Sequence, residues 1–308
     1  MTGPEPLTRP RRLSRGDRVA VVATSGPLAP DRLARGVRTL ESWGLEVTVG
    51  EHALEVRRHL AGTDEQRAAD LQAAWCDPAV RAVLCGRGGS GAARVVDLLD
   101  WTAMRAAGPR VLVGFSDATV LHLAVARRLG LVSLMGPMAA TEVFAGDHPD
   151  AASVAGLRAA LMDPQSARTL AAGTLRSVVA GTARGPLFGG TISLLAQSAG
   201  TADQLPATGA IAVLEDVGEP TYRLDSLITQ LLRTGWFDGV AGVVLGTFEG
   251  CGRDAEEVVA ERLSYLGVPL ATGLPFGHGR PQLTVPLGVE TDLDVDAGTL
   301  VVRQPALR

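Results

Sequence analysis

The sequence predicts an α/β protein whose first half folds as a parallel β-sheet with helices on both faces. Short apolar runs of strand length alternate with longer segments in which apolar residues recur with the helical period. That alternation is typical of parallel sheets. The 308 residues are rich in Ala, Val, Leu and Gly, and only 4% are aromatic, a composition typical of globular enzymes. A chain of this length can form one or two domains with a large core.

The strands and helices of the first half follow from this pattern in order. Apolar runs bounded by turn residues predict strands at 18–24, 44–49, 80–85, 110–113 and 131–134. The 3.6-residue period predicts helices at 31–43, 64–75, 92–99 and 151–162, and one more through Leu121, Val125 and Leu129. Thr63-Asp-Glu-Gln66 has the form of a capping box, which sets the start of the second of these helices.

Near residue 165 the regular alternation of strand and helix patterns gives way to a stretch rich in Ala, Gly, Thr and Val. This change predicts a first domain over 17–165 and a second over 166–308. Residues 1–16 are expected to be a flexible arm, and residues 166–184 a crossover between the domains. Strands are expected at 210–214, 240–247, 283–285, 289–293 and 299–302, and helices at 222–233 and 255–265. Gly189-Gly190-Thr191 is expected to open a further helix that runs through Ala199.

Charge, hydropathy and cysteine usage argue against several classes of protein. The formal net charge is −4 and basic residues are not clustered in excess, so no nucleic-acid partner is expected. The polar start of the chain lacks the apolar segment of a signal peptide, and no apolar run approaches the ~20 residues of a membrane span. The three cysteines lack Cys-x-x-Cys spacing, so neither a disulfide framework nor a metal site is expected. These features favour a cytoplasmic protein without a membrane partner.

The stretch 111–122 carries the central functional signal. An apolar strand breaks at Gly114, presents Ser116 and Asp117, and resumes with helical periodicity. Ser116 is therefore expected at the carboxyl end of a strand and the amino end of a helix, where open α/β sheets bind their ligands. A serine hydroxyl there can act as a nucleophile if a base reaches it. The alternative is an N-cap serine that only starts the helix.

A glycine loop, Gly86-Arg-Gly-Gly-Ser-Gly91, connects a predicted strand to a predicted helix and allows three interpretations. It matches the dinucleotide pattern G-x-G-x-x-G, but it follows the third strand and not the first. No acidic residue ends a following strand about twenty residues later, as that pattern requires. The backbone N–H groups of the loop could instead form an oxyanion hole, or the glycines could only make a tight turn.

A serine nucleophile needs a base and a group that orients the base. His278 lies between two glycines, which let a sharply bent backbone place its imidazole in a cleft. His122 follows Ser116 by six residues on the predicted helix and therefore lies about 9 Å further along its axis. Glu215 ends an apolar strand, where a partly buried carboxylate needs a partner. An imidazole N–H would serve as that partner, and so would a salt bridge to Arg223.

A series of motifs in a fixed order resembles one known family. The motifs are Arg87-Gly-Gly, Gly114-Phe-Ser-Asp-Ala-Thr119, Gly189-Gly190, Leu214-Glu-Asp-Val-Gly-Glu-Pro-Thr-Tyr-Arg223 and Phe276-Gly-His-Gly279. From about residue 17 to its end, the chain resembles the LD-carboxypeptidases, the muramoyl-tetrapeptide carboxypeptidase family that also includes the microcin C self-immunity hydrolases. The resemblance implies an N-terminal flavodoxin-like domain with the serine and a smaller C-terminal α/β domain with Glu and His. It also implies a cleft site between the domains and a cytoplasmic homodimer.

The resemblance implies that Ser116, Glu215 and His278 form a catalytic triad. The implied reaction is hydrolysis of the amide between an L-centre and a terminal D-amino acid, such as the D-Ala of murein tetrapeptide in peptidoglycan recycling. The other candidate site residues are Gly89 and Asp117 for the oxyanion hole and Arg87 and Ser90 for substrate binding. No organic cofactor is expected. The chain departs from the family pattern at Ser90, Met135 and Thr191, where relatives often have Tyr, His and Asn.

Three other functions remain open at this point. A microcin C-type hydrolase of peptidyl or aminoacyl nucleotides tends to carry an extra aromatic-bearing loop. Here the connection between residues 136 and 190 is short, and its only aromatic residues are Phe144 and Phe188. A nicotinamide-dependent oxidoreductase would use the glycine loop but leaves Glu215 and His278 without a role. A non-catalytic sugar- or peptide-binding module would be exported, and no export signal is expected.

Overall fold

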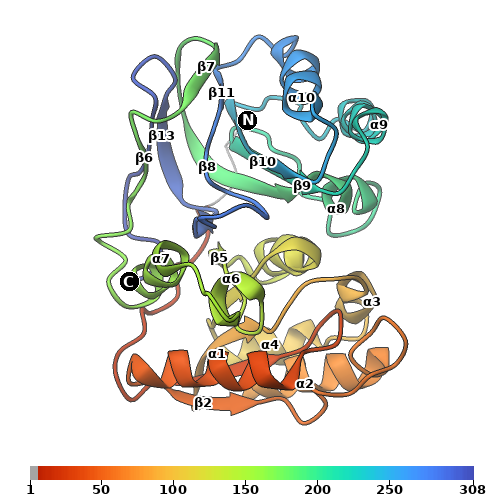
Figure 1. Ribbon diagram of the computed structural model, residues 1–308, viewed down its shortest axis with the longest axis vertical. Coiled ribbons are helices and arrows are strands. Elements are labelled where there is room, and N and C mark those ends of the chain that lie inside the picture. The colour runs from red at the N-terminus through yellow and green to blue at the C-terminus, as the bar shows by residue number, and fades with distance from the viewer. Residues whose placement is uncertain (1–5) are drawn as a thin grey trace.

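The computed structural model describes residues 6–308, which form two β-sheets and the helices that cover them. In Figure 1 the first half of the chain, red to yellow, surrounds the lower sheet, and the second half, green to blue, surrounds the upper one. The buried apolar side chains of the two sheets join in one cluster, which includes Val113 from the first sheet and Val213 from the second. The two halves therefore share a core.

The first sheet has the strand order of a flavodoxin-like fold, extended by one strand from the far end of the chain. Its parallel strands lie in the order β2-β1-β3-β4-β5, and β12 pairs antiparallel with β5. The strands are β1 (Arg18–Val22), β2 (Glu46–Val49), β3 (Val80–Cys85), β4 (Val111–Gly114), β5 (Ser133–Met135) and β12 (Val285–Leu287). The central strands are almost wholly buried, as expected for parallel strands covered on both faces.

Helices cover both faces of this sheet, as the sequence predicts. One layer contains α1 (Pro30–Ser42), α6 (Glu142–Ala145) and α7 (Ala151–Met162), and the other contains α2 (Asp64–Cys76), α3 (Ala92–Val96), α4 (Trp101–Ala107) and α5 (Thr119–Ala124). Connections between parallel strands are right-handed, so the direction of each step across the sheet decides which face its helix covers. The step from β1 to β2 runs opposite to the later steps, and its helix therefore lies on the opposite face. The capping box is confirmed: the Thr63 side chain accepts from the amide of Gln66, whose side chain accepts from the amide of Thr63.

The second sheet is mixed, with strand order β6-β14-β13-β8-β9-β10-β11-β7. Its strands are β6 (Thr169–Ala172), β7 (Arg176–Val179), β8 (Thr182–Thr191), β9 (Ile211–Val217), β10 (Gly242–Glu249), β11 (Leu270–Thr272), β13 (Glu290–Asp294) and β14 (Thr299–Val302). Strands β8 to β11 are parallel, and α8 (Ile192–Gln197), α9 (Thr221–Arg233) and α10 (Ala255–Ser264) pack beside one another against them. The α/β class predicted from the sequence is thus confirmed.

Several expectations about element boundaries are wrong. Gly189-Gly190-Thr191 opens a helix as predicted, with Thr191 at the N-cap of α8, but α8 ends at Gln197 and not at Ala199. The same three residues also complete β8, which the sequence did not predict, because the glycines let this strand approach β9 closely. A Cβ on Gly189 would lie 2.0 Å from the carbonyl oxygen of Val213. The predicted crossover at 166–184 contains β6, β7 and the start of β8. β6 and β7, like β11, are too short to show a clear alternation of apolar and polar residues.

Two further helical segments differ from expectation. The helix predicted at 92–99 ends at Val96, and α4 follows because Asp100 caps it through the amides of Thr102 and Ala103. The segment after Ser116 begins as one turn of 3-10 helix, η1 (Ser116–Ala118), and continues through α5 into a π-helical turn, η2 (Val125–Leu129).

Residues 6–16 are not a loose arm. The amide of Thr8 donates to Gly130 at 2.7 Å, the amide of Arg12 donates to Arg308 at 2.8 Å, and Leu13 is fully buried. This segment packs against the end of the chain, which in Figure 1 lies beside α7. Residues 1–5, the rest of the predicted arm, lie outside the described residues. The domain boundary near residue 165 stays a prediction, and β12 returns the second half of the chain to the first sheet.

Across residues 6–308, none of the helices has both the length and the apolar character needed to cross a membrane. Over the same range, no three His, Cys, Asp or Glu side chains cluster as the ligands of a metal ion would.

Candidate active site

Ser116 occupies a strained turn at the end of β4. Its backbone φ is +60°, and within the described chain only one other non-glycine residue, Arg58, has a positive φ. This conformation costs about 1–3 kcal/mol and tends to occur where a side chain must be presented for function. Phe115 occupies the N-cap position of η1, and no side chain makes a capping hydrogen bond there. Ser116 is therefore not the N-cap serine of the alternative interpretation.

The glycine loop lies directly against this serine. A Cβ on Gly88 would lie 2.9 Å from Cβ and 3.0 Å from Oγ of Ser116, so no larger residue fits between the loop and the hydroxyl. The carbonyl of Gly88 accepts from the amide of Gly26, in the turn after β1, at 3.2 Å. The loops that follow β1, β3 and β4 therefore meet at one edge of the sheet, where open α/β sheets place their sites.

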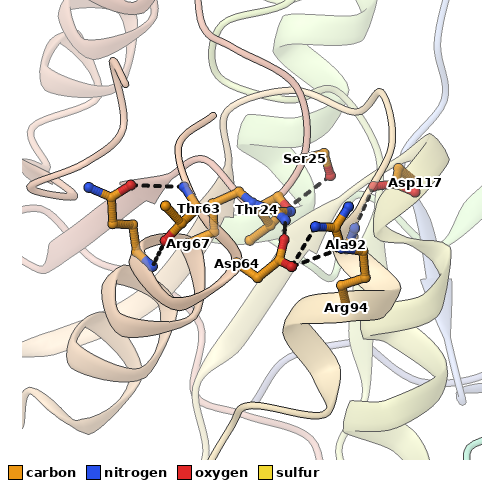
Figure 2. A network of polar contacts seen from close by, with 9 residues as sticks. Thr24, Ser25, Thr63, Asp64, Arg67, Ala92, Arg94 and Asp117 are labelled. Atoms are coloured by element: carbon orange, nitrogen blue, oxygen red, sulfur yellow. Dashed lines mark hydrogen bonds and ion pairs between the residues drawn. The ribbon is translucent and has the colours of Figure 1, made fainter. Parts of the chain in front are cut away.

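Two backbone amides beside Ser116 have the surroundings that an oxyanion hole requires. Gly89 and Asp117 both line a pocket of about 410 Å³. Within residues 6–308, neither of their N–H groups donates to another protein oxygen. The Asp117 carboxylate points elsewhere, since it accepts from the amide of Ala92 at 2.8 Å, as Figure 2 shows. The oxyanion role of the two amides stays a prediction.

A buried arginine, Arg67, is part of a network of polar contacts near the glycine loop, which Figure 2 shows. Arg67 is 1% exposed and donates to the carbonyl of Thr24, two residues after β1, at 2.6 Å. It also pairs with Asp64, which in turn binds Arg94 of α3 at 2.6 Å. The network joins the segment after β1 to the starts of α2 and α3, and α3 is the helix that follows the glycine loop.

Glu215 and His278 are brought into direct contact. Nδ1 of His278 lies 2.7 Å from Oε2 of Glu215, whose side chain is fully buried. The hydroxyl of Thr191 donates to the other carboxylate oxygen at 2.6 Å. Both oxygens of this buried carboxylate therefore have partners, as burial demands. Because Nδ1–H donates to the carboxylate, Nε2 of His278 is left to accept a proton.

The alternative salt bridge between Glu215 and Arg223 does not form. Arg223 instead lies 3.6 Å from Glu219, one helical turn before it. The neighbouring carboxylate, Asp216, points to α8, where it accepts from the amide of Ser193 at 2.8 Å. Burial raises the pKa of Asp216 to about 6. Of the two adjacent acids, only Glu215 therefore faces the histidine.

The glycines beside His278 are needed for this contact. Gly277 has a φ of +137°, and a Cβ there would lie 2.2 Å from Oγ1 of Thr247 and 3.1 Å from the Glu215 carboxylate. The tight bend predicted from the sequence thus lets the histidine loop approach the end of β9. The imidazole ring lies 4.8 Å from the ring of Phe115, the residue before the serine.

Two threonines connect the Glu215 side of the site to the serine turn. The amide of Thr191 donates to Oγ1 of Thr119 at 3.3 Å, and that hydroxyl donates to the carbonyl of Ser116 at 2.7 Å. The described residues include no hydrogen bond between the Ser116 hydroxyl and His278. From the sequence, Thr191 is predicted only as part of a helix start and as a departure from the family pattern, with no role beside Glu215. Its position directly after Gly189-Gly190 was the available signal.

The two residues expected to bind substrate differ in placement. Ser90 is exposed and lines the pocket beside Gly89. Arg87 is exposed, donates to the carbonyl of Pro27 at 3.4 Å, and is not among the residues that line this pocket. A role of either residue in substrate binding stays a prediction.

His122 is buried beneath the serine strand and is not a candidate base. Its Nε2 lies 3.1 Å from the carbonyl of Gly114 and its Nδ1 lies 2.8 Å from Oγ of Ser133. Since a carbonyl can only accept, Nε2 carries the proton and Nδ1 accepts from the serine. Burial lowers the pKa of His122 to about 4. The neutral imidazole therefore joins the end of β4 to the start of β5.

Acid is expected to destabilise the protein through His122. The unfolded chain takes up a proton near the ordinary pKa of 6.5, but the folded chain does so only near pH 4. The free energy of unfolding therefore loses nothing through His122 above pH 6.5, and it falls by about 3 kcal/mol as the pH drops to 4. Urea unfolding of wild type and His122→Gln at pH 7, 5.5 and 4 measures the difference. An equal pH dependence in both, with the exposed His148→Gln as control, would contradict the assignment.

Known proteins resemble this chain over almost its whole length. Residues 19–136 match the LD-carboxypeptidase N-terminal domain, and residues 184–293 match the LD-carboxypeptidase C-terminal domain. A Streptomyces coelicolor protein named as a carboxypeptidase is 52% identical over 309 residues, with 98% of each chain covered. The murein tetrapeptide carboxypeptidase of Pseudomonas aeruginosa is 37% identical over 289 residues, which cover 88% of this chain and 91% of the relative.

Solved structures share the two-domain fold. The microcin C7 self-immunity protein in complex with aspartyl sulfamoyl adenosine has a TM-score of 0.88 at 23% identity, covering 98% of this chain and 100% of that one. At this identity the likeness concerns the fold alone. The muramoyltetrapeptide carboxypeptidase of Oxalobacter formigenes has a TM-score of 0.81 at 28% identity, covering 94% of this chain and 99% of that one.

Proposed function

The chain belongs to the LD-carboxypeptidase family, and from this premise we propose that it is a serine peptidase acting on murein peptides. Its substrate is a peptide such as murein tetrapeptide, from which it removes the terminal D-alanine bound to an L-centre, in peptidoglycan recycling. The observation that carries the proposal is the contact between His278 and the buried Glu215, 2.7 Å apart, next to the strained turn of Ser116. Names of relatives support the substrate class.

The first half of the reaction forms an acyl-enzyme. Oγ of Ser116 bonds to the substrate carbonyl carbon while its proton passes to Nε2 of His278. The amides of Gly89 and Asp117 donate to the oxyanion, and each such donor contributes about 3 kcal/mol to the barrier reduction. The imidazolium then gives its proton to the amine of the D-amino acid as the C–N bond breaks.

Water completes the reaction by the same route. His278 takes a proton from the water that attacks the acyl carbon, and returns it to Oγ of Ser116 as the ester bond breaks. Glu215 holds Nδ1–H in place and stabilises the positive charge that the ring acquires in both steps. No step in this scheme requires a metal ion or an organic cofactor.

The alternative, hydrolysis of peptidyl or aminoacyl nucleotides as in microcin C self-immunity, has less support. The fold resembles that of the self-immunity protein. The only aromatic side chains between residues 136 and 190, Phe144 and Phe188, are buried at 1% and 9% exposure. Neither ring is available to stack on a nucleobase. A nicotinamide-dependent reaction would leave the Glu215–His278 pair without a role.

The proposal also includes a homodimer that acts in the cytoplasm. Both features rest on the resemblance to the family. Light scattering on the purified chain measures the oligomeric state.

Purified enzyme is expected to release D-alanine from a murein tetrapeptide. The same peptide ending in L-alanine should react at least 100-fold more slowly, because the opposite hand at the leaving residue misplaces its amine relative to His278. Release is followed by chromatography and mass spectrometry, with an aminoacyl nucleotide tested alongside. Hydrolysis of the nucleotide but not of the tetrapeptide would transfer the assignment to the alternative.

A further inference from the structure

We infer that Gln282 is a positioning residue for His278. Together with Ser153, it anchors the loop that carries the histidine to the half of the chain that carries Ser116. Glu215 sets which nitrogen of the ring bears the proton, whereas this anchor sets where the ring lies relative to the serine. The inference rests on the proposed function in one respect, since it takes Ser116 as the nucleophile and His278 as its base.

The loop that carries His278 crosses from one sheet to the other. It leaves β11 of the second sheet at Thr272 and enters β12 of the first sheet at Val285. β12 pairs with β5, and β5 pairs with β4, the strand that leads to Ser116. The course of this histidine loop, residues 273–284, therefore determines how far the imidazole lies from the serine turn.

The side chain of Gln282 holds the peptide group immediately before the histidine. It is 5% exposed, and its Nε2 donates to the carbonyl of Gly277 at 3.0 Å. Because a carbonyl oxygen can only accept, the nitrogen of the side-chain amide must face it. Glycine lets this peptide group rotate more freely than another residue would, so a donor bound to its carbonyl selects one orientation. Gln282 therefore restricts the direction in which the side chain of His278 leaves the backbone.

The backbone of Gln282 is bound to the first half of the chain. Its amide donates at 2.7 Å to Oγ of Ser153, a residue of α7 that is 2% exposed. The Ser153 hydroxyl donates in turn to Oδ1 of Asp150 at 2.7 Å, so its single proton is already used and it faces Gln282 as an acceptor. Arg280 adds an exposed contact to the carbonyl of His148 at 3.2 Å. The histidine loop is thus attached at two points to the segment that starts α7.

This anchor and Glu215 hold different parts of His278. Glu215 binds the ring at Nδ1 from the second sheet, whereas Gln282 binds the backbone before the ring. A misplacement of reacting groups by about 1 Å can lower a rate by about 100-fold. Neither Gln282 nor Ser153 lines the pocket beside Gly89. Loss of the anchor is therefore expected to slow the chemical step and to leave substrate binding largely unchanged.

Gln282→Met tests the anchor, because methionine is similar in length to glutamine but cannot donate to the carbonyl of Gly277. We expect kcat for D-alanine release to fall by about 10- to 100-fold, with KM within about twofold of wild type. The rate at which a fluorophosphonate labels Ser116 should fall by a similar factor, since the same base activates the serine in both reactions. Mass mapping of the modified residue identifies the labelled serine.

Variants of Ser153 test the other end of the anchor. Ser153→Ala should give the same fall in kcat at unchanged KM, and Ser153→Thr, which keeps a hydroxyl, should restore most of the activity. In the double variant of Gln282→Met and Ser153→Ala, the combined loss should be smaller than the product of the single losses, because both act on one anchor. Thr291→Val is the matched control. It removes another fully buried hydroxyl, bound to the carbonyl of Val289 on β13 at 3.0 Å, and should change neither rate.

The outcomes separate the inference from the proposed function. A kcat and a labelling rate within about twofold of wild type in Gln282→Met would overturn the inference and leave the carboxypeptidase activity standing. An equal loss in Ser153→Ala and Ser153→Thr would do the same, and this pair decides the question if Gln282→Met does not fold. Wild-type protein that is labelled at Ser116 but releases no D-alanine would overturn the proposed substrate, and the labelling rates would still decide the inference. Absence of label at Ser116 would overturn both.

Discussion

Replacement of Ser116 by alanine is expected to lower kcat for D-alanine release by about 10⁶-fold. The reaction needs an oxygen nucleophile at this turn, and the alanine methyl group cannot supply one. Binding of the tetrapeptide should change little, because the loops around the turn stay in place. Single-turnover assays with equilibrium binding measure the two effects separately. Wild-type turnover in Ser116→Ala would remove this residue from the mechanism.

The strain at Ser116 provides a second readout of the same prediction. Glycine adopts a φ of +60° without the penalty of a side chain, so Ser116→Gly should raise the free energy of unfolding by about 1 kcal/mol while it abolishes turnover. Ser226→Ala, an exposed serine on α9, is the control and should alter neither quantity. A fall in stability on Ser116→Gly would show that the turn is not strained.

Replacement of Glu215 by glutamine is expected to lower kcat by about 10⁴-fold. If the amide nitrogen faces His278, Nδ1 must accept a hydrogen bond and the proton moves to Nε2, which can then no longer take the serine proton. If the amide oxygen faces His278, the neutral ring is held correctly but the imidazolium loses its countercharge. Either arrangement slows proton transfer, and steady-state kinetics with unfolding controls measure the loss. An unchanged kcat would exclude Glu215 as the orienting group.

Variants of Thr191 test the hydrogen bond that supports the Glu215 carboxylate, separately from the carboxylate itself. Thr191→Val keeps the shape of the side chain but leaves Oε1 of Glu215 buried without a donor. A fall in kcat of about tenfold with unchanged KM is expected, because the carboxylate is positioned less well but keeps its charge. Thr191→Ser retains the hydroxyl and should restore most of the activity. An equal loss in both variants would point to packing and not to the hydrogen bond.

The fold class could be predicted because its main signals are local. The buried strands β1, β3 and β4 are continuous apolar runs, and the start of α2 is set by a capping box that lies within four residues. β12 could not be placed in the same way. Its three residues pair with β5, about 150 positions earlier in the chain, and no local pattern specifies a partner so distant.

The candidate site could be predicted only in part, for a similar reason. The bend at Gly277 and the burial of Glu215 are properties of short stretches, and together they indicated a histidine–carboxylate pair. Thr191 gave no comparable signal, since a threonine after two glycines is common. Its contacts with Glu215 and Thr119 depend on how β8 lies beside β9 and on how the two sheets dock.

The return of β12 to the first sheet has a consequence for the order in which the molecule becomes functional during synthesis. As the ribosome extends the chain, the edge of β5 stays unpaired until residues 285–287 have emerged, so the sheet that carries Ser116, the proposed nucleophile, is finished late. The acid and the base also belong to later segments of the polypeptide. A nascent chain that has not yet reached residue 278 therefore holds Ser116 without His278, its proposed proton acceptor.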